Sequence, residues 1–148
     1  MEQNGFPVSY MPEALIRDEA ARGQLFHEWM DDTLFMLAGS GRAAIAVHPA
    51  VKEDSTDALT IRTIMAEAAA YIAGRIQINE WLIEGGSTAA AVIRKLDIDT
   101  LYPEVSLGPG ITRMRARGKD GLYVTLKPGS YEWPLPYLMP QQIQKDQQ

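Results

Sequence analysis

The predicted fold depends on the stretch Trp81-Leu82-Ile83-Glu84-Gly85-Gly86-Ser87-Thr88-Ala89-Ala90-Ala91-Val92-Ile93-Arg94-Lys95-Leu96. The residues before the glycine pair have the pattern of a short apolar strand, and those after it have the pattern of an alanine-rich helix. Glycine tolerates positive φ and lets a ligand approach the backbone closely. Ser87 and Thr88 are residue types that cap helix N-termini. The unit is therefore either a simple tight turn or an anion site, since a helix start offers unpaired N–H groups and a positive dipole end.

The composition describes an ordinary globular protein. The chain has 148 residues, enough for one domain with a core, with 46% hydrophobic and 22% charged residues. A net charge of −5 argues against general binding to nucleic acid, which requires a basic surface. The absence of cysteine excludes disulfides and thiol chemistry and fits a reducing compartment. With no signal pattern and no apolar run long enough to cross a bilayer, we expect a cytoplasmic protein with no membrane partner.

The first two thirds of the chain alternate between helical and strand patterns. Residues 1–11 are predicted to be an irregular lead-in, and a helical region follows from Pro12, which Gly23 is predicted to divide. The pattern then predicts a strand, a helix, a second strand and a second helix: Arg42–His48, a helix ending at Gly74, Ile78–Ile83 and Thr88–Leu96. This order implies a parallel strand pair with a right-handed crossover. Ligands bind beyond the carboxyl ends of such strands, where we expect His48 and the glycine pair.

The last third is predicted to be mostly antiparallel. Ile111–Arg117 and Leu122–Lys127 flank a Gly118–Gly121 turn and predict a β-hairpin, preceded by a weak strand at Leu101–Val105. The predicted fold class is therefore α/β, with a small, mostly parallel sheet flanked by helices and an antiparallel β-hairpin at one edge. We expect a single domain over residues 12–140 and a disordered polar tail over 141–148.

Few residues form a recognisable catalytic pattern. Neither the P-loop nor the dinucleotide-binding glycine motif is present, and two histidines without cysteine argue against a transition-metal site. His48 is either catalytic or structural, and a structural role is favoured because lone histidines are weak signals. A hydrolase that uses Ser87 and His48 is a distant alternative, since the glycine two residues after the serine of a nucleophile elbow is missing.

Basic residues near the predicted hairpin have two interpretations. Arg113, Arg115 and Arg117 occupy every second position, which gives either a stripe facing phosphate or a solvated outer face. The solvated face is favoured, because polar-out alternation is usual in half-exposed sheets. Lys127 could neutralise phosphate as a point charge if the hairpin brings it beside Gly85 and Gly86. Glu84 is the best-placed acidic residue for Mg²⁺, but it could equally brace the turn.

Three segments in order resemble a known family. They are Glu84-Gly85-Gly86-Ser87-Thr88-Ala89, Leu107-Gly108-Pro109-Gly110-Ile111 and Thr125-Leu126-Lys127-Pro128-Gly129-Ser130-Tyr131. Together they resemble the C-terminal nucleotide-binding domain of the four-carbon acid sugar kinase family, over about residues 78–133. Ser87 departs from the family pattern, which more often has an acidic residue there. The Ser-Gly-Ser loop that normally opens the family's nucleotide domain has no counterpart here.

The resemblance implies a site and a reaction class. It implies that ATP phosphates bind at Gly85, Gly86, Ser87 and Thr88, that Gly129 lines the same pocket, that Lys127 contributes and that Mg²⁺ is the accompanying ion. Family members phosphorylate acid sugars such as threonate or erythronate-type compounds, and their presumed catalytic acidic residue lies in a separate N-terminal domain that this sequence does not contain.

The function predicted from this resemblance is an ATP-binding domain of a kinase-like protein of carbohydrate metabolism. We expect it to need a separately encoded substrate domain and to be inactive as a transferase alone, with its catalytic residue and substrate undetermined. The alternative is a non-catalytic interaction or regulatory module that retains the fold. Homo-oligomerisation is expected under either interpretation, because a missing partner domain would leave an apolar patch exposed.

Overall fold

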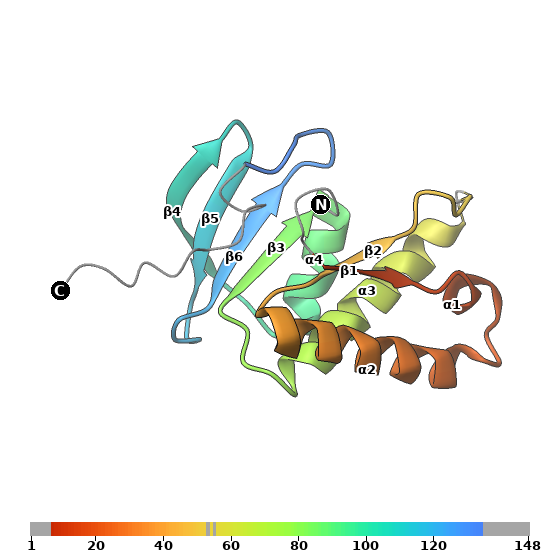
Figure 1. Ribbon diagram of the computed structural model, residues 1–148. Coiled ribbons are helices and arrows are strands. Elements are labelled where there is room, and N and C mark those ends of the chain that lie inside the picture. Colours follow the sequence, from red (N-terminus) through yellow and green to blue (C-terminus); the bar gives the residue numbers. More distant parts are fainter. Residues whose placement is uncertain (1–6, 53, 55, 135–148) are drawn as a thin grey trace.

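The computed structural model describes residues 7–52, 54 and 56–134 (Figure 1). Within them, helices and strands follow one another in the order β1 (Val8–Met11), α1 (Ala14–Arg17), α2 (Arg22–Ser40), β2 (Ala44–Val47), α3 (Asp57–Ala73), β3 (Glu80–Glu84), α4 (Gly86–Lys95), β4 (Leu101–Gly108), β5 (Ile111–Ala116) and β6 (Tyr123–Lys127). None of the helices in this part of the chain has the length and apolar character needed to cross a membrane. The predicted tail at 141–148 lies outside the described residues.

The strands form two sheets, and the predicted α/β class is confirmed. β1 and β2 pair in parallel as a two-stranded sheet, while the second sheet has the order β3-β6-β5-β4. In that sheet β3 and β6 are parallel, and β6, β5 and β4 are antiparallel neighbours, as the predicted hairpin requires. Figure 1 shows this four-stranded sheet with α4 against one face.

The predicted parallel pairing of the two middle strands is wrong. β2 pairs with β1 and β3 pairs with β6, so β2 and β3 are not hydrogen-bonded neighbours. The order strand–helix–strand does not specify which strands become adjacent. Here β6 lies beside β3 with Val124 opposite Trp81 and Leu126 opposite Ile83. These apolar pairs contribute to the core beneath α4, which explains the choice of partner.

The prediction of an irregular lead-in through residue 11 is also wrong, because Val8–Met11 forms β1. Ser9 and Met11 are the buried positions of its alternating pattern. A serine at a buried position hides the apolar alternation that would identify a strand. Its hydroxyl is satisfied by a hydrogen bond of 2.7 Å to the Thr33 hydroxyl on α2, which makes the burial tolerable.

The break between the first two helices falls before the predicted position. Gly23 lies inside α2, and the chain turns over residues 18–21 instead. The Asp18 carboxylate accepts hydrogen bonds from the backbone N–H groups of Ala20 and Ala21, at 3.0 and 3.1 Å, and so stabilises this turn. At the other end, α2 stops as predicted at Gly41, which has φ 71° and donates its N–H to the Leu37 carbonyl.

Helix α3 joins two hydrophobic clusters into one core. Ile64, Met65, Ala68 and Ile72 face the first cluster, which includes residues of β1, α1 and α2. Ala66 and Ala69 face the second, which includes residues of β3, α4, β5 and β6. The alanines of α3 let α4 approach closely. The second cluster therefore fixes the position of α4 against the four-stranded sheet, and with it the turn before α4.

Replacing Met30 by alanine tests this core. Met30 on α2 is fully buried, so Met30→Ala should lower the free energy of unfolding by about 2–5 kcal/mol through lost transfer energy and a cavity. Urea denaturation of both proteins measures the difference. The control is Phe35→Ala on the same helix, where the side chain is 83% exposed. A loss for Met30→Ala no larger than the control's would contradict the described packing.

Candidate functional site

Three turns meet at one edge of the four-stranded sheet. β3 and β6 are parallel, so their carboxyl ends lie at the same edge, and the turn between the antiparallel β4 and β5 lies there too. The Gly85 N–H donates to the Lys127 carbonyl at 2.9 Å, which ties the end of β3 to the end of β6. A Cβ added to Gly110 would lie 3.0 Å from the Pro128 side chain. The three motifs of the sequence, far apart in the chain, therefore come together in space.

Gly85 makes the abrupt change from strand to helix. It has φ 88°, a conformation that favours glycine, and it is the N-cap of α4. The prediction that Ser87 or Thr88 caps the helix is wrong: both lie in its first turn, and no side chain caps it. The first intrahelical bond runs from the Ala89 N–H to the Gly85 carbonyl. The N–H groups of residues 86–88 therefore have no acceptor within the helix, and they lie at its positive end.

A pocket of about 280 Å³ opens beside this helix start. It is lined by Gly85, Gly86, Ala89, Gly110, Leu126, Lys127 and Pro128. Of the site residues predicted from sequence, Gly85, Gly86 and Lys127 line it, whereas Ser87, Thr88 and Gly129 do not. Sequence reasoning did not select Gly110 or Pro128, although both belong to the motifs quoted above. Ala89 could have been found as the residue one helical turn after Gly86.

The hairpin brings Lys127 beside the glycine pair, which was the condition for a role in phosphate binding. Its ammonium group, however, is already paired within the protein. Its side chain is 1% exposed, and its Nζ lies 3.1 Å from a carboxylate oxygen of Glu84. The same Nζ donates to the carbonyls of Pro128 and Tyr131, and it lies 5.4 Å from the centre of the Trp133 ring. An ammonium group has three hydrogens, so these acceptors use its full capacity. Lys127 therefore fixes the turn after β6 and pairs with Glu84.

Glu84 is the carboxylate at the rim of this site. Its side chain is half exposed, and one of its oxygens lies 4.0 Å from the position of a Cβ added to Gly129. Among the described residues, no group of three histidine, cysteine, aspartate or glutamate side chains could hold a metal ion. Glu84 is thus a single carboxylate beside a helix start. That matches the usual magnesium arrangement, in which one or two carboxylates act together with phosphates and water.

The other candidates lie elsewhere. His48 is exposed, its ring packs edge-on against Tyr10 at 4.7 Å, and its Nδ1 accepts the Ala50 N–H, so it does not reach the pocket. The three arginines form ion pairs: Arg113 with Glu80, Arg115 with Glu104 and Arg117 with Asp99. Arg115 and Arg117 are exposed, as the favoured solvated face predicts, whereas Arg113 is half-buried. The hydrogen bond from Arg117 lowers the pKa of the Asp99 carboxyl.

Comparisons with known proteins identify relatives of this fold. Residues 2–131 match the model of a family described as nucleotide-binding C-terminal domain. The search of curated proteins gives no match. A DUF1537 protein from Bordetella bronchiseptica, a domain-swapped dimer with bound citrate, has a TM-score of 0.70 and 19% identity over 88% of this chain and 33% of its own.

Two further solved structures share the fold. A DUF1537 protein from Haemophilus influenzae has a TM-score of 0.66 at 19% identity over 86% of this chain and 32% of its own. A putative tRNA synthase from Salmonella typhimurium LT2 has a TM-score of 0.67 at 14% identity over 88% and 32%. The chain therefore spans about a third of the length of the solved proteins that it matches.

The structural role of Lys127 can be tested by Lys127→Met. This change keeps much of the side-chain volume but leaves two carbonyls and Glu84 without their donor, so unfolding free energy should fall by about 1–3 kcal/mol. Chemical denaturation without any ligand measures it. Lys52→Met, at an exposed lysine, is the control and should change stability by less than about 0.5 kcal/mol. Equal stability of the two variants would show that the Lys127 contacts do not support the turn.

Proposed function

Because the chain belongs to the family of nucleotide-binding C-terminal domains, we propose that the pocket between the ends of β3 and β6 binds the phosphate groups of ATP. The observation that carries this proposal is the convergence of three turns on the start of α4. The N–H groups of Gly86, Ser87 and Thr88 would donate to phosphate oxygens, and the helix dipole favours the negative charge. A Cβ added at Gly86 meets no atom within 4 Å, so the approach to this backbone is open.

The charges around the pocket fit a nucleotide that arrives with magnesium. Lys127 is paired with Glu84, so the two side chains together contribute little net charge. Mg²⁺ would supply the positive charge that triphosphate oxygens need, and Glu84 is the residue that would hold it. In this proposal Lys127 positions Glu84 and the turn after β6. The Ser87 and Thr88 hydroxyls, in the first turn of α4, are further donors for the same phosphates.

Phosphoryl transfer would need a second component. We propose that the chain acts with a separately encoded domain that binds an acid sugar and supplies the residue that activates its hydroxyl group. This proposal rests on the resemblance to the four-carbon acid sugar kinase family, whose substrate site lies outside the nucleotide-binding domain. Transfer to an alcohol depends mostly on positioning and on stabilising the developing charge. The pocket at the start of α4 positions only the nucleotide, so the chain alone should not be an active kinase. The cytoplasm, where ATP is abundant, is the proposed location.

One observation favours a second candidate, a regulatory or interaction module that retains the fold. Among the described residues that line the pocket, Lys127 is the only one with a cationic side chain, and its hydrogens are already used. Without a free cationic side chain, phosphate binding would thus depend on backbone N–H groups, the Ser87 and Thr88 hydroxyls and magnesium. In the second candidate the pocket no longer binds nucleotide, and the surface around it binds another protein.

Self-association is part of either proposal. The Bordetella protein of similar fold is a domain-swapped dimer, and we propose that this chain forms homo-oligomers as well. Sedimentation velocity at several concentrations measures the mass in solution. A monomer over the whole concentration range would contradict this part of the proposal without affecting nucleotide binding.

Mg·ATP should stabilise the folded protein. At a free nucleotide concentration about a hundred times Kd, binding adds ~2.7 kcal/mol to the free energy of unfolding. Thermal denaturation with and without Mg·ATP measures this stabilisation as a shift in the unfolding temperature. The same experiment with ATP and EDTA shows how much of the shift depends on magnesium. No shift at millimolar nucleotide would reject nucleotide binding and leave the second candidate.

Gly86→Val tests whether the turn is the phosphate site. The valine side chain would project into open space at the pocket and should abolish the nucleotide-induced shift with little change in basal stability. Gly23→Val is a matched control, since Gly23 also lies at a helix start with no atom within 4 Å of an added Cβ. An undiminished shift in Gly86→Val would place nucleotide binding elsewhere.

ADP formation by the chain alone, with acid sugars added, would contradict the need for a second domain.

A further inference from the structure

An aromatic side chain lies at the rim of the pocket at α4 and has no part in the proposed phosphate contacts. Tyr131 is 48% exposed. Its ring carbon Cε2 lies 3.9 Å from the position of a Cβ added to Gly110, a residue that lines the pocket. Pro128, which also lines the pocket, is hydrogen-bonded to Tyr131 within one turn. The ring therefore borders the space in which the nucleotide is proposed to bind.

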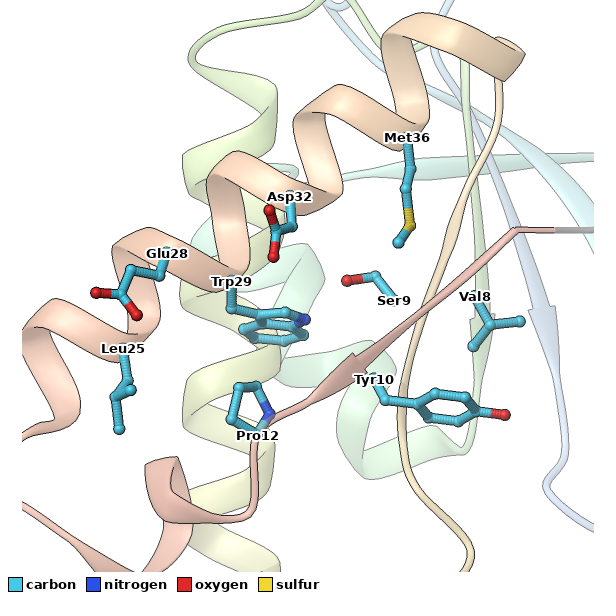
Figure 2. Close-up of a pocket in the computed structure, with 9 residues that line it drawn as sticks. All are labelled: Val8, Ser9, Tyr10, Pro12, Leu25, Glu28, Trp29, Asp32 and Met36. Carbon is cyan, nitrogen blue, oxygen red and sulfur yellow. The ribbon is translucent and has the colours of Figure 1, made fainter.

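A second pocket shows the contrast with an aromatic ring that is already covered. This pocket lies between β1 and α2 and has a volume of about 260 Å³; Figure 2 shows the side chains that line it. The indole of Trp29 is among them, but Trp29 is only 4% exposed because protein atoms cover its ring. A ring that receives a ligand must have a free face. Tyr131, at the other pocket, has the exposed surface that stacking requires.

The backbone of Tyr131 is fixed by hydrogen bonds within the turn. Its N–H donates to the Pro128 carbonyl at 3.2 Å, and its carbonyl accepts a hydrogen bond from the Lys127 ammonium group. The Lys127 side chain is buried, so water does not compete for this bond. When a ligand stacks on the ring, only the rotations of the Tyr131 side chain remain to be lost, which lowers the entropic cost of binding.

This arrangement gives a reason for the buried charge of Lys127. Burial of an ammonium group is costly, and an apolar side chain of similar volume would avoid that cost. The ammonium group donates to the carbonyls of Pro128 and Tyr131 and pairs with Glu84. The buried lysine therefore stabilises the conformation of the turn over residues 128–131, and with it the position of the Tyr131 ring.

The lining of the pocket offers little to distinguish one nucleotide from another. The N–H groups at the start of α4 bind phosphate oxygens whatever nucleoside carries them. Apart from glycines and Lys127, the described lining residues are Ala89, Leu126 and Pro128, and none of these side chains has a hydrogen-bonding group. Since the Lys127 hydrogens are already used, the lining cannot recognise the polar edge of a base. Contact with the flat face of the base is the remaining means of selection.

We propose that the Tyr131 ring stacks on the base of the bound nucleotide and that the site selects purine over pyrimidine nucleotides without distinguishing adenine from guanine. This inference rests on the proposed binding of nucleotide phosphates at the start of α4. A purine presents a larger face to the ring than a pyrimidine does. Stacking accepts any base with a π-face, so it needs no hydrogen bond to the base edge.

Calorimetric titration of the full chain tests the proposal with the magnesium complexes of ATP, GTP, CTP and methyl triphosphate. Methyl triphosphate has the charge of ATP but no nucleoside. ATP and GTP should bind with affinities within about twofold of each other, and both should bind about tenfold more tightly than methyl triphosphate, with CTP between them. Equal affinities for ATP and methyl triphosphate, or for ATP and CTP, would overturn the stacking and leave the phosphate site intact. No binding of any of the four would reject the phosphate site and this inference with it.

Variants assign the effect to the ring. Tyr131→Ala should weaken Mg·ATP binding about tenfold and leave the affinity for magnesium methyl triphosphate unchanged, whereas Tyr131→Phe should keep both affinities. Tyr102→Ala is the control, because Tyr102 is 42% exposed but lies near the start of β4, at the opposite end of that strand from the pocket. It should change neither affinity. An equal loss of both ligands in Tyr131→Ala would indicate a disturbed turn and overturn the proposal, as would an unchanged affinity for ATP.

Discussion

The candidate nucleotide site depends on one backbone hydrogen bond and the strand pairing it extends. The Gly85 N–H reaches the Lys127 carbonyl just beyond the register that sets Glu84 opposite Lys127. Because β3 and β6 are parallel, their carboxyl ends coincide, and the turns that follow them face the same space. A change of this register by one residue would exchange the faces of the strand. The buried ammonium group of Lys127 would then point to the α4 side, away from Glu84.

Most of the fold was predictable from hydrophobic periodicity and from glycine. The hairpin of β5 and β6, the strand before Gly85 and the end of α2 at Gly41 follow from local patterns, and the three ordered motifs correctly indicated the family. Two features of the strands were not predicted. β1 was missed because the buried Ser9 breaks its apolar alternation, and the partner of β3 was missed because pairing depends on which distant apolar residues meet. Sequence also could not show that the charge of Lys127 is already paired.

The two pockets differ in how their polar groups are arranged. At α4 the unsatisfied groups are backbone N–H groups at a helix end, which suit an anion of almost any attached structure. The pocket between β1 and α2 is instead lined by side chains, among them the exposed carboxylates of Glu28 and Asp32 and the buried indole of Trp29. The backbone groups at α4 come from the turns of the fold itself, whereas the lining of the other pocket depends on individual side chains.

The long separation between β3 and β6 has a consequence during synthesis. Thr125 donates to Glu80 across the two strands, although the residues are 45 positions apart in the chain. Contacts at such separation form late, because the intervening loop must first be ordered. While the chain leaves the ribosome, α4 can form before β6 exists, but its N-terminus then has no pocket beside it. Any ligand at this edge would thus recognise only a chain in which β6 has already been added to the sheet.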